Sequence, residues 1–268
     1  LGGGGLIQEN SSLFNVFRWT SKLWYAGRLG KKCCVYANSV GRIRFPFNRY
    51  LIRKAFSRVA FVTLRDALSK RHLEELGITR NVFVTADVVF SLDFPELPLS
   101  AHQGVPMDLS QDYVALAIRH CFDSVPLLPA RVSARLKIQS SAQKAKYERF
   151  IAETARTVEY LRDLGYQILF IPFYGQRDVR LAREVCARIA DQRGVLIYDR
   201  PDASPAIHAD LIRKSRLLIG MRLHSIVFAV MTGTPVLPII YHDKLQGLVK
   251  MLGLEARQKP NWKEWEKL

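Results

Sequence analysis

The 268-residue sequence has few cysteines, few acidic residues and no long apolar run. Its 4 cysteines are too few for a disulfide-stapled secreted module, and their spacing fits no structural zinc site. The longest uncharged run, residues 226–241, is cut by glycine and proline. It is shorter than the roughly 20 apolar residues that a membrane-spanning helix needs. We therefore expect a protein without a transmembrane segment, with reduced and mostly buried thiols, in the cytoplasm.

The shortage of acidic residues leaves a large positive charge. With 24 Asp and Glu against 40 Lys and Arg, the formal net charge is +16. An apolar share of 49% excludes a disordered tail, because such chains lack the residues to form a core. The charge predicts an anionic partner, which could be nucleic acid, an acidic membrane, a phosphorylated metabolite or an acidic glycan.

The sequence begins with Leu1 and a run of glycines rather than with methionine. This pattern is typical of a strand that enters a loop, so we expect at least one N-terminal βα unit to be missing. Consecutive glycines let backbone N–H groups approach an anion closely. The run nevertheless matches neither the P-loop nor the dinucleotide-binding fingerprint, and by itself it is also compatible with a flexible end.

Apolar runs alternate with amphipathic stretches along the chain, which predicts an α/β fold with parallel sheets. The predicted strands are 33–37, 60–64, 82–86, 113–118, 167–172, 195–198, 217–220 and 236–240. The predicted helices are 66–76, 142–164 and 179–192, with two more that begin near Pro205 and Arg222. Asp66 is the expected N-cap of the first helix, and Gly77 and Gly165 are expected to end the first two.

A segment with three prolines, residues 91–111, has little periodicity and predicts a linker between two domains. We expect an N-terminal domain over residues 1–105, a second domain over 106–254 and a terminal segment over 255–268. In open parallel sheets the ligand binds outside the carboxyl ends of the strands, so residues that follow strands are the candidates for function.

Two arginines follow predicted strands directly. Arg65 comes after residues 60–64, and Arg119 after residues 113–118. The guanidinium group suits phosphate or carboxylate, although each arginine could instead be a solvated surface residue, and Arg65 could pair with Asp66 across the helix cap. Two strand-end arginines favour an anion site more than either does alone.

The junction after residues 217–220 carries the most informative residues. Arg222 and His224 lie in the predicted first turn of an apolar helix, and Lys244 follows 20 residues after His224. A lone histidine is usually structural, but a histidine beside an arginine at a strand-to-helix junction is a good candidate for a general acid. In this interpretation Arg222 holds an anion while His224 delivers a proton.

These segments together resemble the polysaccharide pyruvyltransferase family, whose members transfer a pyruvyl group from phosphoenolpyruvate (PEP) to a sugar. The matching segments are 2–8, Arg65-Asp66 with Ser69, 85–87, 117–119, 171–173 with Asp178, 220–225, Tyr241 and Lys244. Two segments depart from the family pattern: residues 37–42 replace a second glycine-rich loop, and His242-Asp243 replaces Asp-Pro before Lys244.

The resemblance implies two Rossmann-like domains in a glycosyltransferase-B-like (GT-B-like) arrangement, with a truncated N-terminal domain on the acceptor side, PEP on the other, and the active site between them. It implies His224 as the general acid. It implies Arg65, Arg222, Lys244 and Arg119 as the PEP-binding residues, and Gly3, Gly4, Gly5 and Ser225 as residues near the substrate. PEP would be the donor substrate, with no cofactor and no metal, and the acceptor would be a sugar or a lipid-linked glycan of a cell-surface polysaccharide.

Two alternative functions remain open. A nucleotide-sugar-dependent glycosyltransferase of the same architecture would need a ribose-binding carboxylate, for which Asp178 and Asp199 are candidates. A nucleic-acid-binding protein is disfavoured, because the basic residues are scattered and no binding motif occurs. The terminal Trp262 and Trp265 could anchor to a membrane interface, but we favour a helix that packs back on the first domain. The remaining basic residues fit a peripheral contact with the inner face of the membrane.

Overall fold

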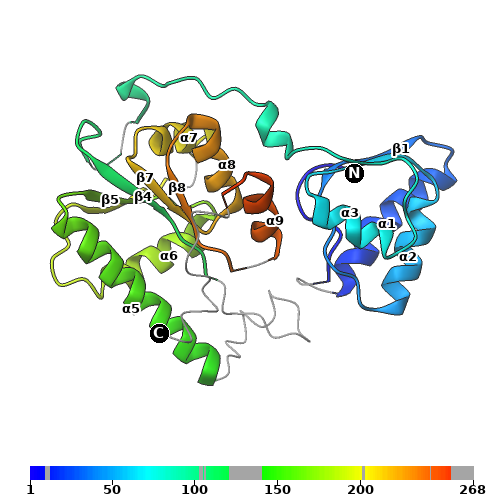
Figure 1. Cartoon of the computed structure of the whole chain (residues 1–268), viewed down its shortest axis with the longest axis horizontal. Coiled ribbons are helices and arrows are strands. Elements are labelled where there is room, and N and C mark those ends of the chain that lie inside the picture. Colours follow the sequence, from blue (N-terminus) through cyan, green and yellow to red (C-terminus); the bar gives the residue numbers. More distant parts are fainter. Residues whose placement is uncertain are drawn as a thin grey trace. The chain divides into compact units, whose positions relative to one another are not determined.

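The computed structural model describes residues 1–9, 13–102, 105, 107–120, 141–200, 203–241 and 243–254. This part of the chain forms two compact units (Figure 1). The first unit contains residues 1–92 and 243–253, and the second contains residues 93–120 and 141–241. Each unit is built around its own parallel sheet, as the alternation of apolar and amphipathic segments predicts.

The first unit has a three-stranded parallel sheet in the order β1-β2-β3. Its strands are β1 (Cys33–Asn38), β2 (Val59–Leu64) and β3 (Val82–Val84), and its helices are α1 (Leu13–Arg28), α2 (Pro46–Phe56), α3 (Ala67–Glu74) and α9 (Asp243–Met251). Val35, Val62 and Val82 are in register and buried on one face. Phe61 and Phe83 are exposed on the opposite face.

The second unit has a five-stranded parallel sheet in the order β6-β5-β4-β7-β8. The central strand β4 (Tyr113–Ala117) is buried along its whole length, as expected for a strand covered on both faces. Its other strands are β5 (Gln167–Phe170), β6 (Val195–Ile197), β7 (Leu217–Gly220) and β8 (Val236–Pro238). Its helices are α5 (Ser141–Asp163), α6 (Gly175–Cys186), α7 (Pro205–Arg213) and α8 (Leu223–Thr232).

Several predicted helix boundaries are confirmed, and one is wrong. Asp66 caps α3 by accepting a hydrogen bond from the backbone N–H of Ser69 at 2.7 Å, and Gly77, the residue predicted to end this helix, lies just beyond it with a positive φ. Helix α6, however, runs over residues 175–186 instead of 179–192. The side-chain amide of Gln192 donates to the carbonyl of Cys186, which satisfies an acceptor at the actual end of the helix.

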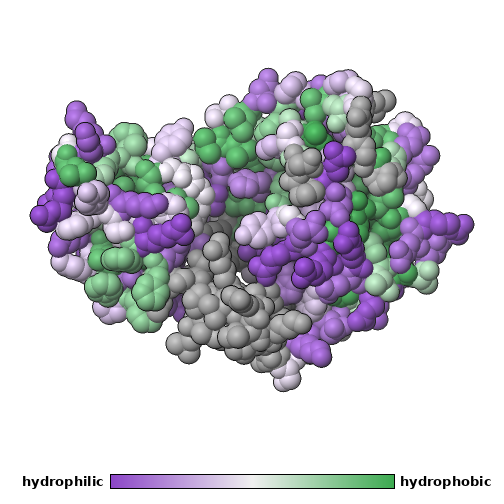
Figure 2. Space-filling model, turned by 180° about the vertical axis from the view of Figure 1, so that it is seen from behind, coloured by the Kyte–Doolittle hydropathy of each residue, from purple (hydrophilic) through white to green (hydrophobic). Residues whose placement is uncertain are grey.

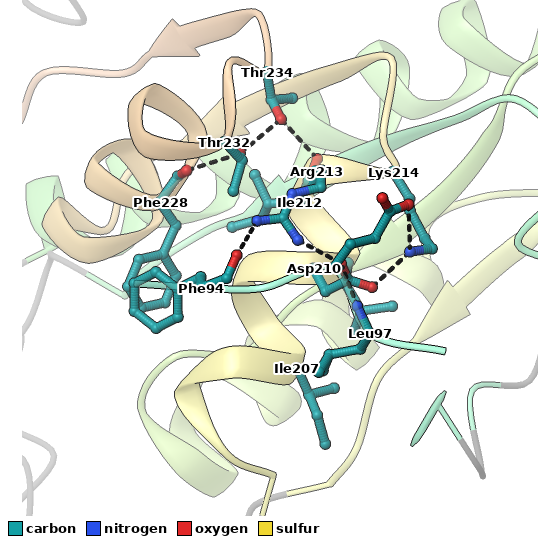
Figure 3. Close-up of polar contacts among 12 residues, drawn as sticks. Phe94, Leu97, Ile207, Asp210, Ile212, Arg213, Lys214, Phe228, Thr232 and Thr234 are labelled. Carbon is teal, nitrogen blue, oxygen red and sulfur yellow. Dashed lines mark hydrogen bonds and ion pairs between the residues drawn. The ribbon is translucent and has the colours of Figure 1, made fainter. Parts of the chain in front are cut away.

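The proline-rich segment after the first unit docks on α7 and α8 through a buried carboxylate (Figure 3). Asp210 is fully buried, and it accepts hydrogen bonds from Arg213, from Lys214 and from the backbone N–H of Leu97. Arg213 also donates to the carbonyl of Phe94, and the Phe94 ring packs at 4.9 Å from the Phe228 ring. The first part of the segment that the sequence predicts as a linker, residues 94–97, is therefore packed against α7 and α8 of the second unit.

Both units present apolar side chains between hydrophilic ones on the face seen in Figure 2. No helix in the described part of the chain is long and apolar enough to cross a membrane. Of the three described cysteines only Cys186 is buried, and its burial raises the pKa of the thiol. Cys33 and Cys34 are half-buried at the start of β1, so the prediction of mostly buried thiols is wrong for this pair.

Candidate active site

The second unit contains a point where the strand order reverses. The strands run from β4 through β5 to β6 in one direction, and from β4 to β7 and β8 in the other. In open parallel sheets the ligand binds outside the carboxyl ends of the two strands that flank such a reversal, here β4 and β7. The last residues of these strands, Ala117 and Gly220, are paired in the sheet. Arg119 and Arg222 each follow at the second position beyond that pair.

Arg222 is held by a buried carboxylate. Its Nε donates to Oδ2 of Asp178 at 2.9 Å, and its Nη2 donates to Oδ1 of the same group. Asp178 also accepts hydrogen bonds from the backbone N–H groups of Phe173 and Tyr174, at 3.1 and 2.9 Å. The Arg222 guanidinium carbon lies 5.3 Å from the centre of the Tyr174 ring. This bidentate pair fixes the orientation of Arg222, and Nη1 is the nitrogen that takes no part in it.

The start of α8 places His224 two residues after this arginine. Arg222 is the N-cap of α8 in extended backbone, and His224 is exposed in the first turn. The close approach of α8 to β7 favours glycine at position 220, because a Cβ there would make a tight contact of 3.0 Å with the Ser225 hydroxyl. Ser225 itself is fully buried, and its hydroxyl donates to the carbonyl of Arg222 at 2.8 Å. This hydroxyl is thus engaged within the turn, and its predicted nearness to the substrate stays a prediction.

Arg119 is joined to Tyr241, which lies three residues beyond the end of β8. Its Nη1 donates to the hydroxyl of Tyr241 at 2.5 Å, and its guanidinium carbon lies 5.2 Å from the centre of the same ring. Arg119 and Tyr241 are 122 residues apart in the sequence. The two residues therefore form a cation–aromatic pair beside the paired strands β4 and β7.

In the first unit, Arg65 is buried rather than solvated. Only 8% of it is exposed, and its Nη1 lies 2.5 Å from Oδ2 of Asp87. The alternative of a surface pair with Asp66 is wrong, because Asp66 is engaged by Ser39 and by Ser69. Arg65 instead links the end of β2 to the short 3₁₀ helix η1 (Val88–Ser91), whose N-cap is Asp87.

The glycine run lies beside β1 and makes a defined loop. Gly3 donates to the carbonyl of Tyr36 at 2.9 Å, and the carbonyl of Gly4 accepts from the N–H of Ser39 at 2.9 Å. Gly3 and Gly4 both have positive φ, which glycine adopts without steric cost. The segment before Gly5 thus runs parallel to β1 and then turns, as the sequence predicts for a strand that enters a loop.

The end of β1 is strained, and the sequence did not reveal this. Ala37 has a φ of 45°, which is rare for a residue with a Cβ. Asn38 is fully buried, and its Oδ1 has no hydrogen-bond partner within the described residues. One sign of this feature was present in the sequence: residues 37–42 differ from the family pattern, which has a glycine-rich loop at this place. Ala37 adopts a backbone conformation in which glycine would be unstrained.

Lys244 is the second residue of α9, and its side chain lies outside the described part of the structure. Residues 255–268, with Trp262 and Trp265, also lie outside it. The two carboxylates considered for a nucleotide ribose are both engaged. Asp178 holds Arg222, and Asp199 pairs with Arg183 at 2.7 Å. Among the described residues, no group of three His, Cys, Asp or Glu side chains could hold a metal ion.

A second histidine lies near the same loop, in a different environment from His224. His208 packs against Phe173 at 5.2 Å and against Tyr198 at 5.9 Å between ring centres. Burial lowers the pKa of His208 below its ordinary value, and backbone hydrogen bonds with Ser204 and Pro172 offset this only in part. His208 is consequently neutral near pH 7, which makes it a poor proton donor.

The sequence of this chain is similar to those of known proteins. Residues 1–243 match the family model described as polysaccharide pyruvyl transferase. Over 237 residues the chain is 25% identical to the amylovoran biosynthesis protein AmsJ of Erwinia amylovora. That match covers 84% of this chain and 52% of AmsJ, so the chain spans about half the length of this curated relative.

Solved structures with a similar fold include two UDP-GlcNAc 2-epimerases. The enzyme from Methanocaldococcus jannaschii has a TM-score of 0.55 and 13% identity, over 97% of this chain and 71% of that one. The enzyme from Neisseria meningitidis, solved with UDP-GlcNAc, has a TM-score of 0.53 and 12% identity, over 94% and 76%. At these identities the likeness shows the fold alone, which is mixed α/β with parallel sheets, as in GT-B-like proteins. By its match over residues 1–243, the chain belongs to the polysaccharide pyruvyl transferase family.

Proposed function

We propose that this chain transfers a pyruvyl group from PEP to two hydroxyls of a sugar, forming a ketal and releasing phosphate. The observation that carries the proposal is the junction between β7 and α8. There Arg222, fixed by the buried Asp178, precedes the exposed His224 at the reversal of strand order. A positioned cation beside a titratable donor suits an anionic substrate that must be protonated.

The chemistry of PEP explains why these two groups are needed together. PEP is the phosphate ester of an enol, and it also carries a carboxylate. Addition of a proton to its methylene carbon makes C2 an oxocarbenium-like centre, which a first sugar hydroxyl attacks with loss of its proton. The bond from C2 to the phosphate oxygen then breaks, phosphate leaves, and a second hydroxyl closes the ketal with loss of its proton.

We assign the proton donation to His224 and the binding of the anionic groups to arginine and lysine. Arg222 and Arg119 flank the carboxyl ends of the paired strands β4 and β7, where they would hold the phosphate and the carboxylate of PEP. Arg65 and Lys244 would add positive charge that stabilises the departing phosphate. The loop of Gly3, Gly4 and Gly5 and the residue Ser225 would lie near the substrate, and the first unit would bind the acceptor.

The acceptor in this proposal is a sugar or a lipid-linked glycan of a polysaccharide precursor. Membership of the family and the 25% sequence identity to AmsJ support a role in polysaccharide biosynthesis. The reaction as proposed takes place in the cytoplasm, where PEP is available, and it needs no cofactor or metal.

Incubation with PEP and a panel of sugars tests the proposal. The expected result is inorganic phosphate by ³¹P NMR, together with a ketal methyl signal by ¹H NMR, both dependent on one of the sugars. A parallel incubation with UDP-sugars tests the alternative of a glycosyltransferase. The proposal would be overturned if none of the sugars changed the rate of phosphate release. It would also be overturned by glycosyl transfer from a UDP-sugar.

A further inference from the structure

The first unit carries a surface on which large aromatic side chains lie among basic ones. Between Glu9 and Asp66 the sequence has twelve Lys or Arg residues and no acidic residue. This stretch includes α1 and α2, which pack against each other. The solvent-facing sides of these two helices, here called the basic aromatic face, therefore carry positive charge that no neighbouring carboxylate on the same stretch offsets.

The helical spacing puts aromatic and basic residues on the same side. On α1, Phe14, Arg18 and Tyr25 share one face, while Val16 and Leu23 are buried on the other. On α2, Phe47, Tyr50 and Lys54 share the exposed face. Phe14, Tyr25 and Phe47 are each more than 60% exposed. On the face seen in Figure 2, apolar and hydrophilic side chains alternate over the first unit.

Exposed aromatic rings flanked by cations suit the interface of a membrane that contains anionic lipids. The rings can enter the headgroup region while the cations stay at the level of the phosphates. The tryptophans are placed differently. Lys22 lies 4.4 Å from the centre of the Trp19 ring, and the Arg28 guanidinium lies 5.0 Å from that of Trp24. Because cations already cover these rings, they are poorly placed to stack on nucleic-acid bases, which favours a lipid surface over nucleic acid.

We propose that the basic aromatic face binds the surface of a bilayer rich in anionic phospholipid. The partner is recognised by its negative surface charge and by an apolar layer beneath the headgroups. Binding of this kind does not depend on pyruvyl transfer, so its test and the test of the proposed function can fail separately.

Flotation of the purified chain with phospholipid vesicles tests this proposal. Vesicles of phosphatidylcholine are compared with vesicles in which a third of the lipid is phosphatidylglycerol, at low and high salt. We expect binding only to the anionic vesicles and weaker binding at high salt. A duplex DNA of matched phosphate concentration is titrated in parallel.

Two variants with matched controls locate the surface. The triple variant Arg18→Gln, Arg28→Gln, Lys54→Gln removes three cations from the face, and Lys144→Gln, Arg149→Gln, Arg180→Gln removes three exposed cations from α5 and α6. Since each cation near an anionic surface contributes about fivefold to binding, the first variant is expected to lose about a hundredfold and the control little.

The aromatic contribution is tested in the same way. Phe17→Ser with Tyr25→Ser removes exposed rings from α1, whereas Phe61→Ser with Phe83→Ser removes exposed rings from the uncovered side of the sheet. The first pair is expected to weaken vesicle binding about tenfold, and the second pair is expected not to weaken it. Unchanged thermal unfolding of each variant shows that it is folded.

Three outcomes would overturn the proposal. One is an equal loss of vesicle binding in the variants of the basic aromatic face and in their controls, which would indicate nonspecific electrostatic or hydrophobic adsorption. Another is tighter binding to duplex DNA than to anionic vesicles, which would point to nucleic acid. The third is equal binding to neutral and anionic vesicles.

Discussion

Each of the three arginines that follow a strand is held by a residue far away in the sequence. Asp87 is 22 residues from Arg65, Asp178 is 44 from Arg222, and Tyr241 is 122 from Arg119. The arginines could be found from the sequence, because each stands directly after an apolar run. Their partners could not be assigned from periodicity, since these contacts depend on which strands become neighbours in the sheet.

The Asp178–Arg222 pair makes a prediction about affinity and stability. Asp178→Asn keeps the size of the side chain but removes the charge that orients Arg222. We expect a loss of about 3 kcal/mol of unfolding free energy, because a largely buried cation loses its partner, together with weaker PEP binding. Urea unfolding and calorimetric titration with PEP measure the two effects.

Asp199→Asn is the matched control, since Asp199 pairs with the well-exposed Arg183. This variant should change the unfolding free energy by less than about 1 kcal/mol and leave PEP binding unchanged. If Asp178→Asn bound PEP as tightly as the natural protein does, the assigned role of Arg222 would be wrong.

The assignment of His224 as the general acid predicts a loss of turnover when this residue is replaced. His224→Ala should lower kcat by about 10²–10⁴-fold with little change in KM for PEP, as expected for loss of a general acid. Arg222→Ala should raise KM as well, because it removes a group that holds the substrate in its ground state. Steady-state kinetics with PEP as the varied substrate separate the two effects.

Val230→Ala serves as the control for the histidine variant. Val230 is an exposed residue of the same helix, and its truncation should leave kcat unchanged. Retention of natural turnover by His224→Ala would show that another group donates the proton.

At the scale of the elements, the strands were the best predicted part. Buried parallel strands appear in sequence as short apolar runs, and all eight described strands fall on predicted ones. Helices α1, α2 and α9 were not predicted. α1 has exposed aromatic residues opposite its buried side, which hides the 3.6-residue period, and α2 begins at Pro46 without a side-chain cap.

The contact between residues 94–97 and the buried Asp210 of α7 predicts how the stability of the fold changes in acid. Burial would raise the pKa of Asp210, but hydrogen bonds from Lys214, from the Leu97 N–H and from Arg213 outweigh it, and the pKa is lowered. The ionised carboxylate therefore stabilises the fold at pH values above the ordinary aspartate pKa of about 3.9. This stabilisation is lost as the pH falls below about 4 and through the lower pKa of the folded state.

Asp210→Asn should remove that acid-sensitive part of the stability. At pH 7 we expect a loss of about 3 kcal/mol, because Arg213 and Lys214 lose a buried partner. Below pH 4 the variant and the natural protein should become more similar in stability. Urea unfolding at a series of pH values checks this, and a constant difference across the whole range would contradict the assignment.

At the scale of the whole molecule, the alternation of strands and helices was enough to predict two α/β units with parallel sheets. It was not enough to predict the order of the strands, because that order is decided by which apolar faces pack together. The reversal between β4 and β7 follows from this order, and it places Arg119 and Arg222 just beyond the carboxyl ends of two adjacent strands. The candidate arginines could be identified from the sequence, whereas the pairing of β4 with β7 explains why they lie at the same end of the sheet.

In the proposed reaction a proton is added to the methylene carbon of PEP, and the pyruvyl group is transferred to the sugar rather than the phosphoryl group. Reaction with PEP and an accepted sugar in D₂O tests this directly. We expect a sugar ketal whose methyl group carries one deuterium, with the phosphorus recovered as inorganic phosphate. A phosphorylated sugar together with free pyruvate would contradict it, because phosphoryl transfer would then be the reaction.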